Sequence, residues 1–243
     1  MPTATGPTAV VPFRAAARVV AATAARLDRP GPHGRATEVT TLPDAARCFL
    51  RHPRPPVLLG TVGSLATVRL ARGRFGRADV LIAASMAATQ PFVEWAVHRE
   101  ILHAQPTNPI SRAFHRTAGW GHEQHHRDPT SLDTMFVRPQ EVLGSGTIAL
   151  ALAVFGSPRT ATAALCAAVG LLAYDWTHFL IHSSYQPRSR MYRRHWRNHR
   201  LHHFRNEHYW LGVTSNIGDI VLGTNPPRDA VVISPTAIRA PTR

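Results

Sequence analysis

The segment 161–182 reads ATAALCAAVGLLAYDWTHFLIH, an apolar run that ends in two histidines four residues apart. Its apolar composition and length predict a helix. A free-standing transmembrane helix needs about 20 apolar residues, and the apolar part, 161–174, is shorter than that. Such a helix can still lie in a membrane if its last turns end in a polar site lined by protein. We therefore expect this segment to carry His178 and His182 into a polar site.

Three further apolar stretches precede it, at residues 57–68, 80–93 and 142–155. The stretch 80–93 also leads into a histidine-rich segment, and Gly-Ser-Pro-Arg at 156–159 breaks the chain between the last two stretches. The pattern predicts an all-α integral membrane protein with two transmembrane helical hairpins, about four spans in total. The alternative is a soluble bundle of four buried helices, which the mean hydropathy of −0.14 favours.

The apolar stretches divide the chain into three parts. Residues 1–55 are rich in Ala, Arg, Pro and Thr, and we expect a flexible tail with one short amphipathic helix at 15–27. Residues 56–225 contain the hairpins and the histidine clusters, and we expect one membrane-embedded catalytic domain there. Residues 226–243 contain prolines and are expected to form an irregular C-terminal tail.

All 28 residues in the Lys and Arg count are arginine, and the formal net charge is +14. The absence of lysine indicates a GC-rich coding bias, so charge alone does not separate an anionic membrane surface from nucleic acid. Arginines crowd the histidine-rich segments, above all at 188–205, which predicts that this side faces the cytoplasm. Arg72, Arg74 and Arg77, in the turn of the first hairpin, conflict with that orientation.

Cysteine usage points to a reducing setting. Cys48 and Cys166 lie far apart and provide neither a disulfide framework nor a thiolate metal site. The N-terminus shows no apolar core followed by a small-residue cleavage site, so no signal peptide is expected.

Histidine is the most informative residue type, because all 15 except His33 and His52 lie between residues 98 and 208. Four clusters stand out. They are His98 with His103, then His122, His125 and His126, then His178 with His182, and finally His199, His202 and His203. On a helix, residues at i, i+3 and i+4 share one face. The last three clusters therefore present their imidazoles to one side, where facing helices can enclose metal ions.

The first cluster has a different spacing. His98 and His103 are five residues apart, which is about 140° around an ideal helix. They can share one metal ion only if the helix ends or unwinds there, as Pro106 suggests. Otherwise they serve two different ions.

Ten imidazoles exceed the needs of one ion, because a structural zinc site takes four ligands. Two ions with about five nitrogen donors each would use the whole set, with an open position left for a reactant. Neutral imidazole suits iron, zinc, copper and nickel, so the spacing does not fix the metal. Glu100 and Glu123 begin Glu-x-x-His pairs like those of carboxylate-bridged di-iron bundles, and this remains a second possibility.

Two other classes of protein are alternatives. A membrane zinc hydrolase needs about three protein ligands per catalytic ion, so ten histidines are too many. A nucleic-acid-binding protein would interleave aromatic and basic residues, as Tyr192, Trp196, Tyr209 and Trp210 do, but it leaves the hairpins unexplained. We therefore expect no nucleic-acid partner. Candidates to contact the outer side of the ligand rings are Glu94, Asp128, Asp175, His195, Asn198 and His208.

The four clusters, in this order and with a hydrophobic hairpin between the second and third, resemble the fatty acid hydroxylase/sterol desaturase superfamily. The resemblance covers roughly residues 90–223. Tyr174-Asp175 ahead of His178, and Leu-Gly-Val-Thr-Ser at 211–215 followed by Asp219, are similar to the fatty acid 2-hydroxylase branch. Asn198 departs from the pattern, because a histidine often precedes the last cluster, and this leaves the ligand count open.

The resemblance implies that the ten clustered histidines hold two iron ions, which zinc can replace in purified or crystallised protein, with O2 as co-substrate. It implies hydroxylation of a C–H bond on a lipid acyl chain, in a bacterial cytoplasmic membrane, with a histidine-rich helical cap facing the cytoplasm. Sterol or carotenoid hydroxylation and desaturation are the alternatives within the superfamily. We expect no fused cytochrome b5-like module and therefore an external electron donor, either a ferredoxin or a cytochrome b5-like protein with its reductase.

Overall fold

The computed structural model describes residues 10–29 and 31–237, and the regular structure within them is helical. The one β-type pairing in this part of the chain is an isolated bridge between Arg35 and Ser131. The prediction of an all-α chain is therefore confirmed. The α-helices are α1 (Val10–Leu27), α2 (Leu42–Arg51), α3 (Pro55–Ala71), α4 (Arg77–Val97), α5 (Pro109–Phe114), α6 (Trp120–Arg127), α7 (Leu132–Met135), α8 (Pro139–Phe155), α9 (Pro158–His182), α10 (Arg190–Phe204) and α11 (Ile217–Val221). The 3-10 turns are η1 (Ala36–Glu38) and η4 (Arg228–Ala230), and the π-turns are η2 (His98–Leu102) and η3 (His115–Gly119).

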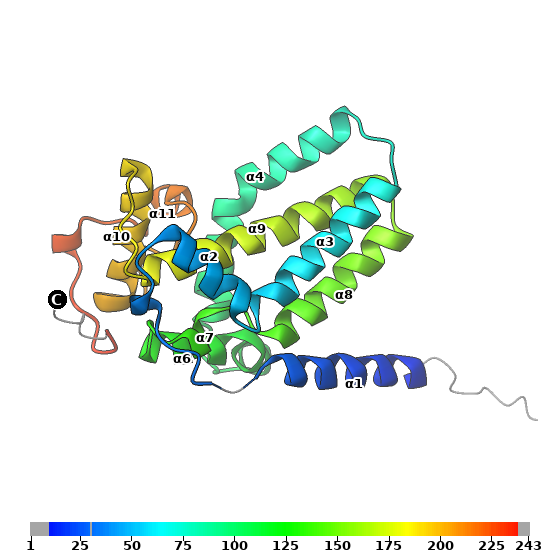
Figure 1. Ribbon diagram of the computed structural model, residues 1–243. Coiled ribbons are helices and arrows are strands. Elements are labelled where there is room, and N and C mark those ends of the chain that lie inside the picture. The colour runs from blue at the N-terminus through cyan, green and yellow to red at the C-terminus, as the bar shows by residue number, and fades with distance from the viewer. Residues whose placement is uncertain (1–9, 30, 238–243) are drawn as a thin grey trace, which may run out of the picture.

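Four long helices, α3, α4, α8 and α9, form the body of the molecule (Figure 1). α9 packs against each of the other three, and α3 also packs against α8. Local sequence sets the helix starts. Ser157 Oγ accepts a hydrogen bond from the Thr160 amide at 3.2 Å, and Pro158 occupies the first turn of α9. α8 and α9 thus form a packed hairpin, whereas α3 and α4, which follow each other in the chain, each pack mainly against α9.

Two helices are long and apolar enough to cross a membrane, judged by length and composition. One is the continuous helix Arg77–Leu102, which joins α4 to η2, and the other is α9. At a rise of 1.5 Å per residue, they extend roughly 37–39 Å. Only 11 % of the most apolar window of Arg77–Leu102 is buried, against 33 % for α9. Neither helix is therefore enclosed by the rest of the protein.

Arginines hold the end of the bundle where α3 turns into α4. The Arg69 side chain is 3 % exposed, pairs with Asp79 at 2.8 Å and donates to Thr162 Oγ1 at 2.6 Å. Arg72 donates to the carbonyls of Val154, at 2.8 Å, and Gly156. The last carbonyls of a helix have no partner within the helix, so Arg72 closes the C-terminus of α8. This contact gives Arg72 a structural role that does not depend on membrane orientation.

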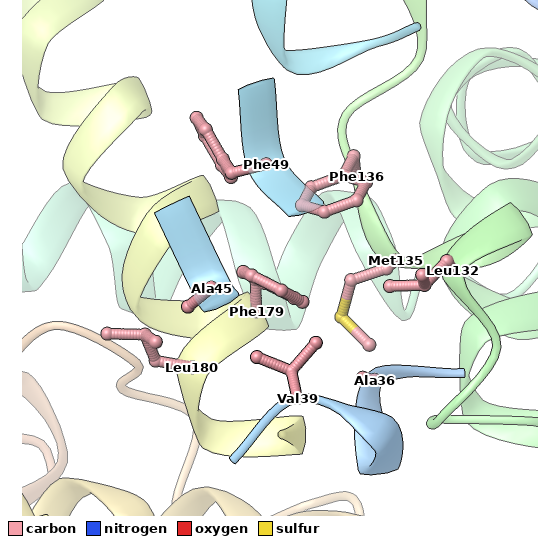
Figure 2. Packing of buried hydrophobic residues seen from close by; sticks show 9 residues of the cluster. All are labelled: Ala36, Val39, Ala45, Phe49, Leu132, Met135, Phe136, Phe179 and Leu180. Atoms are coloured by element: carbon pink, nitrogen blue, oxygen red, sulfur yellow. The ribbon is translucent and has the colours of Figure 1, made fainter. Parts of the chain in front are cut away.

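The segment 36–51 is part of the core, although residues 1–55 are expected to form a flexible tail. Val39, Ala45 and Phe49 are buried in one cluster with Phe179 of α9, and Figure 2 shows the side chains of this cluster. The segment has few apolar residues, but α2 places them on one face, and overall composition does not reveal this. The helix expected at 15–27 is present as α1, which packs against α8.

The described C-terminal segment has little regular structure. Residues 226–237 contain η4 and are otherwise irregular, and the Ser234 amide donates to the Arg205 carbonyl at 2.7 Å. Residues 1–9, 30 and 238–243, which belong to the two expected tails, lie outside the described residues.

The shorter helices gather at the end of the bundle where α4 and α9 finish (Figure 1). α6 and α7 lie on one side of this end, and α10 and α11 lie on the other. All four histidine clusters are in this region, on α4–η2, α6, α9 and α10. The fold thus brings together residues about a hundred positions apart in the sequence, such as His103 and His202.

Candidate metal centre

The structure brings the ten clustered histidines together in two groups of five. In each group the candidate ligand nitrogens all lie within 4.8 Å of one another. The first group consists of His98, His103, His122, His126 and His202. The second group consists of His125, His178, His182, His199 and His203. Rings from both groups touch, since those of His126 and His203 stack with centroids 4.1 Å apart.

A π-turn resolves the unusual spacing of His98 and His103. The amide of His103 donates to the carbonyl of His98 at 3.1 Å, which is the i→i+5 bond of a π-helix. The wider turn brings residue i+5 back over residue i, and the two rings stack with centroids 5.2 Å apart. Both histidines therefore belong to the first group. Gly119 of η3 lies against this turn, because a Cβ there would be 3.2 Å from the Leu102 carbonyl oxygen.

Each H-x-x-H-H triplet is shared between the two groups. On α6, His122 and His126 belong to the first group and His125 to the second. On α10, His202 belongs to the first group, while His199 and His203 belong to the second. In both triplets the i and i+4 residues stay together and the i+3 residue turns to the other group. A single helix face thus provides ligands to both groups.

The first group converges on its Nε2 atoms. His122 Nε2 is 3.1 Å from the Nε2 atoms of both His98 and His103, and His202 Nε2 is 3.1 Å from that of His126 and 3.2 Å from that of His103. The Nδ1 atoms of His98 and His202 contact backbone carbonyl oxygens and must donate to them. In a neutral ring the Nε2 atom then carries only a lone pair. Lone pairs that converge in this way fit a cation.

The second group has the same donor chemistry in a fully buried setting. His125 Nε2 lies 3.3 Å from His182 Nε2, and His203 Nε2 lies 3.1 Å from His199 Nε2. His178 Nε2 is buried without a hydrogen-bond partner among the described residues. An imidazole nitrogen that is buried and unpaired costs free energy unless it binds something. These five residues therefore also fit a metal ion.

Burial keeps the rings in the form that binds metals. Burial, together with the neighbouring His98 and His178, lowers the pKa of His126 to about 3. Burial likewise holds the pKa of His122, His202 and His203 well below its usual value. The rings are therefore neutral near pH 7, with a lone pair free for coordination.

The segment 209–214 fixes two rings of the first group. His202 Nδ1 donates to the Tyr209 carbonyl at 2.9 Å, and His98 Nδ1 donates to the Leu211 carbonyl at 2.5 Å. Trp210, between them, is buried and has φ = 54°, in the left-handed region that such a residue rarely adopts. Sequence reasoning missed these backbone acceptors, although the Leu-Gly-Val-Thr-Ser motif that begins at Leu211 marks the segment.

Comparison with known proteins identifies this arrangement. The family model described as "Fatty acid hydroxylase" matches residues 83–224, more than half of the chain. This chain belongs to the fatty acid hydroxylase family. Two curated relatives come from Arabidopsis thaliana. "Dihydroceramide fatty acyl 2-hydroxylase FAH2" is 27 % identical over 71 % of this chain and 72 % of its own length. "Dihydroceramide fatty acyl 2-hydroxylase FAH1" is 29 % identical over 57 % of this chain and 58 % of its own length.

A solved structure shares the fold. The structure described as "Full length scs7p (only hydroxylase domain visible)" superposes with a TM-score of 0.57 and 23 % identity. The match covers 82 % of this chain and 71 % of that one. The family expected from the histidine clusters is thus confirmed, and the matched segment contains all ten of them.

In this fatty acid hydroxylase, the carboxylates considered as outer contacts bind other partners. Glu94 accepts from the amides of Val213 and Thr214, the latter at 2.9 Å, and from the Thr214 hydroxyl at 2.5 Å. Asp175 accepts from the Val137 amide at 3.1 Å. Asp128 pairs with Arg35 at 2.7 Å. Glu94 thus helps to hold segment 209–214, while Asp128 and Asp175 stabilise connections near α6 and α8.

The remaining candidates lie outside both groups. His195 contacts Asn216, the Asn198 side-chain amide donates to Asn225 at 2.7 Å, and His208 is exposed beside Glu207. Glu100 is an exposed partner of Arg99, and Glu123 pairs with His115 and Arg127. Neither of these two glutamates is in a metal-compatible group, so the donor set of both groups is nitrogen only.

A cavity of about 260 Å³ opens beside the histidines. His122 of the first group and His125 and His178 of the second line it, so it reaches both groups. Tyr174 stacks on His178 with ring centroids 5.5 Å apart and lines the cavity as well. Arg54 and Arg138 line the same cavity. A substrate in this cavity would meet both groups and two guanidinium groups at once.

Proposed function

We propose that this fatty acid hydroxylase uses O2 and two iron ions to hydroxylate carbon 2 of a lipid acyl chain. The observation that carries the proposal is the convergence of ten imidazoles into two five-nitrogen groups in contact with each other. The curated relatives, whose names describe acyl 2-hydroxylation of dihydroceramide, support the position of attack.

Each group would hold one ion. His98, His103, His122, His126 and His202 are the proposed ligands of one, and His125, His178, His182, His199 and His203 are those of the other. Five nitrogens leave a position open on an octahedral ion, and imidazole suits iron. When bound, the ion pair supplies the O2 activation that an unactivated C–H bond requires. The protein itself positions the substrate and excludes water.

The 260 Å³ cavity is the proposed place of the reacting carbon. Hydroxylation at carbon 2 requires the adjacent acyl carbonyl to lie in the same cavity, so polar donors are needed there. Arg54 is held by Asp28 at 2.8 Å and Arg138 by Glu141 at 2.6 Å. A guanidinium has five N–H donors, so each can also donate to a carbonyl or headgroup oxygen while its carboxylate fixes its orientation.

A second cavity, of about 300 Å³, is lined by residues of α3, α8 and α9. Val142 and Leu171 line it, one and three residues from Glu141 and Tyr174, which line the first cavity. Its walls are largely apolar. We assign the acyl tail to this cavity, which places the tail inside the bundle and carbon 2 at the histidines.

The proposed setting is a membrane crossed by both hairpins, about four spans. Large apolar side chains such as Val80, Leu81, Ile148 and Phe155 are exposed on the hairpins, with Phe155 at 88 %. A face of this kind is stable against lipid rather than water. α3 and α8 are 17 residues each, at the short end of the range for a span. The arginine-rich α10 lies at the histidine end, which by the positive-inside bias faces the cytoplasm.

An external electron donor completes the proposal. A basic surface on α10 suits an acidic ferredoxin or a cytochrome b5-like protein, because opposite charges steer association. An acidic electron donor would account for the positive charge of α10 without a nucleic-acid partner.

The test is expression of the full chain, followed by lipid extraction and mass spectrometry for one added oxygen at carbon 2. His202→Ala should abolish this product while the protein still accumulates in the membrane. His115→Ala is the matched control, because His115 bonds Glu123 and lies outside both groups. Hydroxylated product from His202→Ala at the wild-type level would overturn the ligand assignment.

A further inference from the structure

We propose that the two ion sites are unequal, with the first group binding its ion more tightly, and that Asp219 is the positioning residue responsible. The inference rests on the proposed function, since it concerns the same ten histidines. It follows from what holds the outer side of each ring, which differs between the two groups.

In the first group, two rings are oriented before any ion arrives. The Tyr209 and Leu211 carbonyls accept from the Nδ1 atoms of His202 and His98 at 2.9 and 2.5 Å. These bonds fix both the tautomer and the ring plane, so the Nε2 lone pairs already point inward. Little rotational freedom remains to be lost when the ion binds.

Asp219 holds the segment that carries those carbonyls. Its side chain is fully buried and accepts from the Leu211 amide at 2.9 Å, the Gly212 amide at 2.8 Å and Thr224 Oγ1 at 2.6 Å. Thr224 in turn accepts from Trp95 Nε1 at 2.8 Å, which ties the segment to α4. These bonds offset the strain of the positive φ at Trp210.

The second group has less support of this kind, since among the described residues its one ring with a backbone hydrogen bond is His178, to Met135. The Nδ1 atoms of His125, His182, His199 and His203 are buried and have no acceptor in the part of the chain that the structure describes. Packing alone orients these four rings. Ordering them around an ion therefore has a larger cost than in the first group.

The first group is also more accessible to solvent than the second. All five histidines of the second group are buried, whereas His103 and His126 of the first group are partly exposed. An ion arriving from solvent at His103 or His126 meets the first group before the second, while the 260 Å³ cavity reaches both groups. We therefore infer that the first group fills first as well as more tightly.

The experiment is an anaerobic titration of the metal-free full chain in detergent with Co²⁺. Binding is monitored by visible absorption spectroscopy and by equilibrium dialysis. Outer contacts to metal-bound histidines change affinity by about 10–100-fold, so two uptake steps separated by about that factor are expected. His122→Ala should remove the tighter step and His182→Ala the weaker one. Two equal steps in the wild type would overturn the inference.

Asp219→Asn tests the positioning role. An asparagine at this position places an N–H donor against one of the backbone amides that donate to Asp219, so segment 209–214 should shift. The affinity of the tighter step should then fall about 10–100-fold, while the affinity of the weaker step stays the same. Asp79→Asn is the control, since Asp79 also accepts three hydrogen bonds but lies at the other end of the bundle. Its two steps should match those of the wild type.

The outcomes separate the two proposals. If Asp219→Asn leaves the tighter step unchanged or weakens only the other one, the inference is overturned while the di-iron proposal stands. If the wild type binds no ion at either group, the proposed function fails as well.

Discussion

Phe49 connects the N-terminal segment to the histidine end of α9, and its replacement by alanine gives a quantitative test of that connection. The ring is 4 % exposed. It packs edge-on against Phe136 and Trp176, with centroids 5.5 and 5.2 Å apart, and lies 6.3 Å from Phe179. Phe179 is adjacent to His178 on α9, so the cluster supports a proposed ligand helix.

The expected loss in free energy of unfolding for Phe49→Ala is large. Truncating a buried phenylalanine costs about 3–5 kcal/mol, since the lost transfer energy adds to that of the cavity. For a chain of this size, 1 kcal/mol shifts the melting temperature by roughly 2–4 °C, so a decrease of about 6–20 °C is expected. The assay is thermal unfolding in detergent with bound metal measured in parallel, and weaker binding at the second group should accompany the loss.

Leu50→Ala is the matched control, because Leu50 is next in α2 and 59 % exposed. Exposed positions change stability by about 0.5 kcal/mol or less, so the two variants should differ clearly. Equal melting temperatures for Phe49→Ala and wild type would show that the packing of residues 36–51 against α9 does not stabilise the fold.

Three further predictions follow from the fold and the proposed site. Arg69→Met should lower the free energy of unfolding, because it leaves Asp79 without its ion-pair partner; thermal unfolding measures this, and an unchanged melting temperature would contradict it. Removing metal with a chelator should lower the melting temperature, because an ion that binds only the folded state stabilises it; added Fe²⁺ should restore it, and an unchanged melting temperature would count against metal binding. Ala168→Phe narrows the apolar cavity and should shift the hydroxylated products toward shorter acyl chains; mass spectrometry with mixed chain lengths measures this, and an unchanged distribution would exclude the cavity as the tail site.

Sequence reasoning predicts the helices and selects the ten histidines that the structure brings together, because both depend on short-range periodicity. The pair His178 and His182 shows this, since the i, i+4 spacing alone places both rings on one side of a helix. The spacing of His98 and His103 leaves two alternatives, because it does not indicate whether the turn is α or π. The structure supplies the π-turn that unites them.

Features that depend on long-range contacts could not be predicted. Phe49 reads as one aromatic residue in a polar segment, and only its contact with α9 shows that it belongs to the core. Arg72 conflicts with the membrane-orientation rule until its contact with the α8 carbonyls is seen. The carbonyl acceptors at Tyr209 and Leu211 are backbone atoms, which no residue pattern encodes directly.

The sharing of α6 and α10 between the two groups restricts how each ion site can be adjusted. A rotation of α6 moves His122 and His125 together, so it changes both sites at once. Among the described residues, the turn of His98 and His103 and the end of α9 carry proposed ligands for a single group. Segment 209–214 supports His98 in that turn, as it also supports His202 on α10, and α2 packs against α9. The fold can thus adjust one site without disturbing the other, which two ions with different affinities would require.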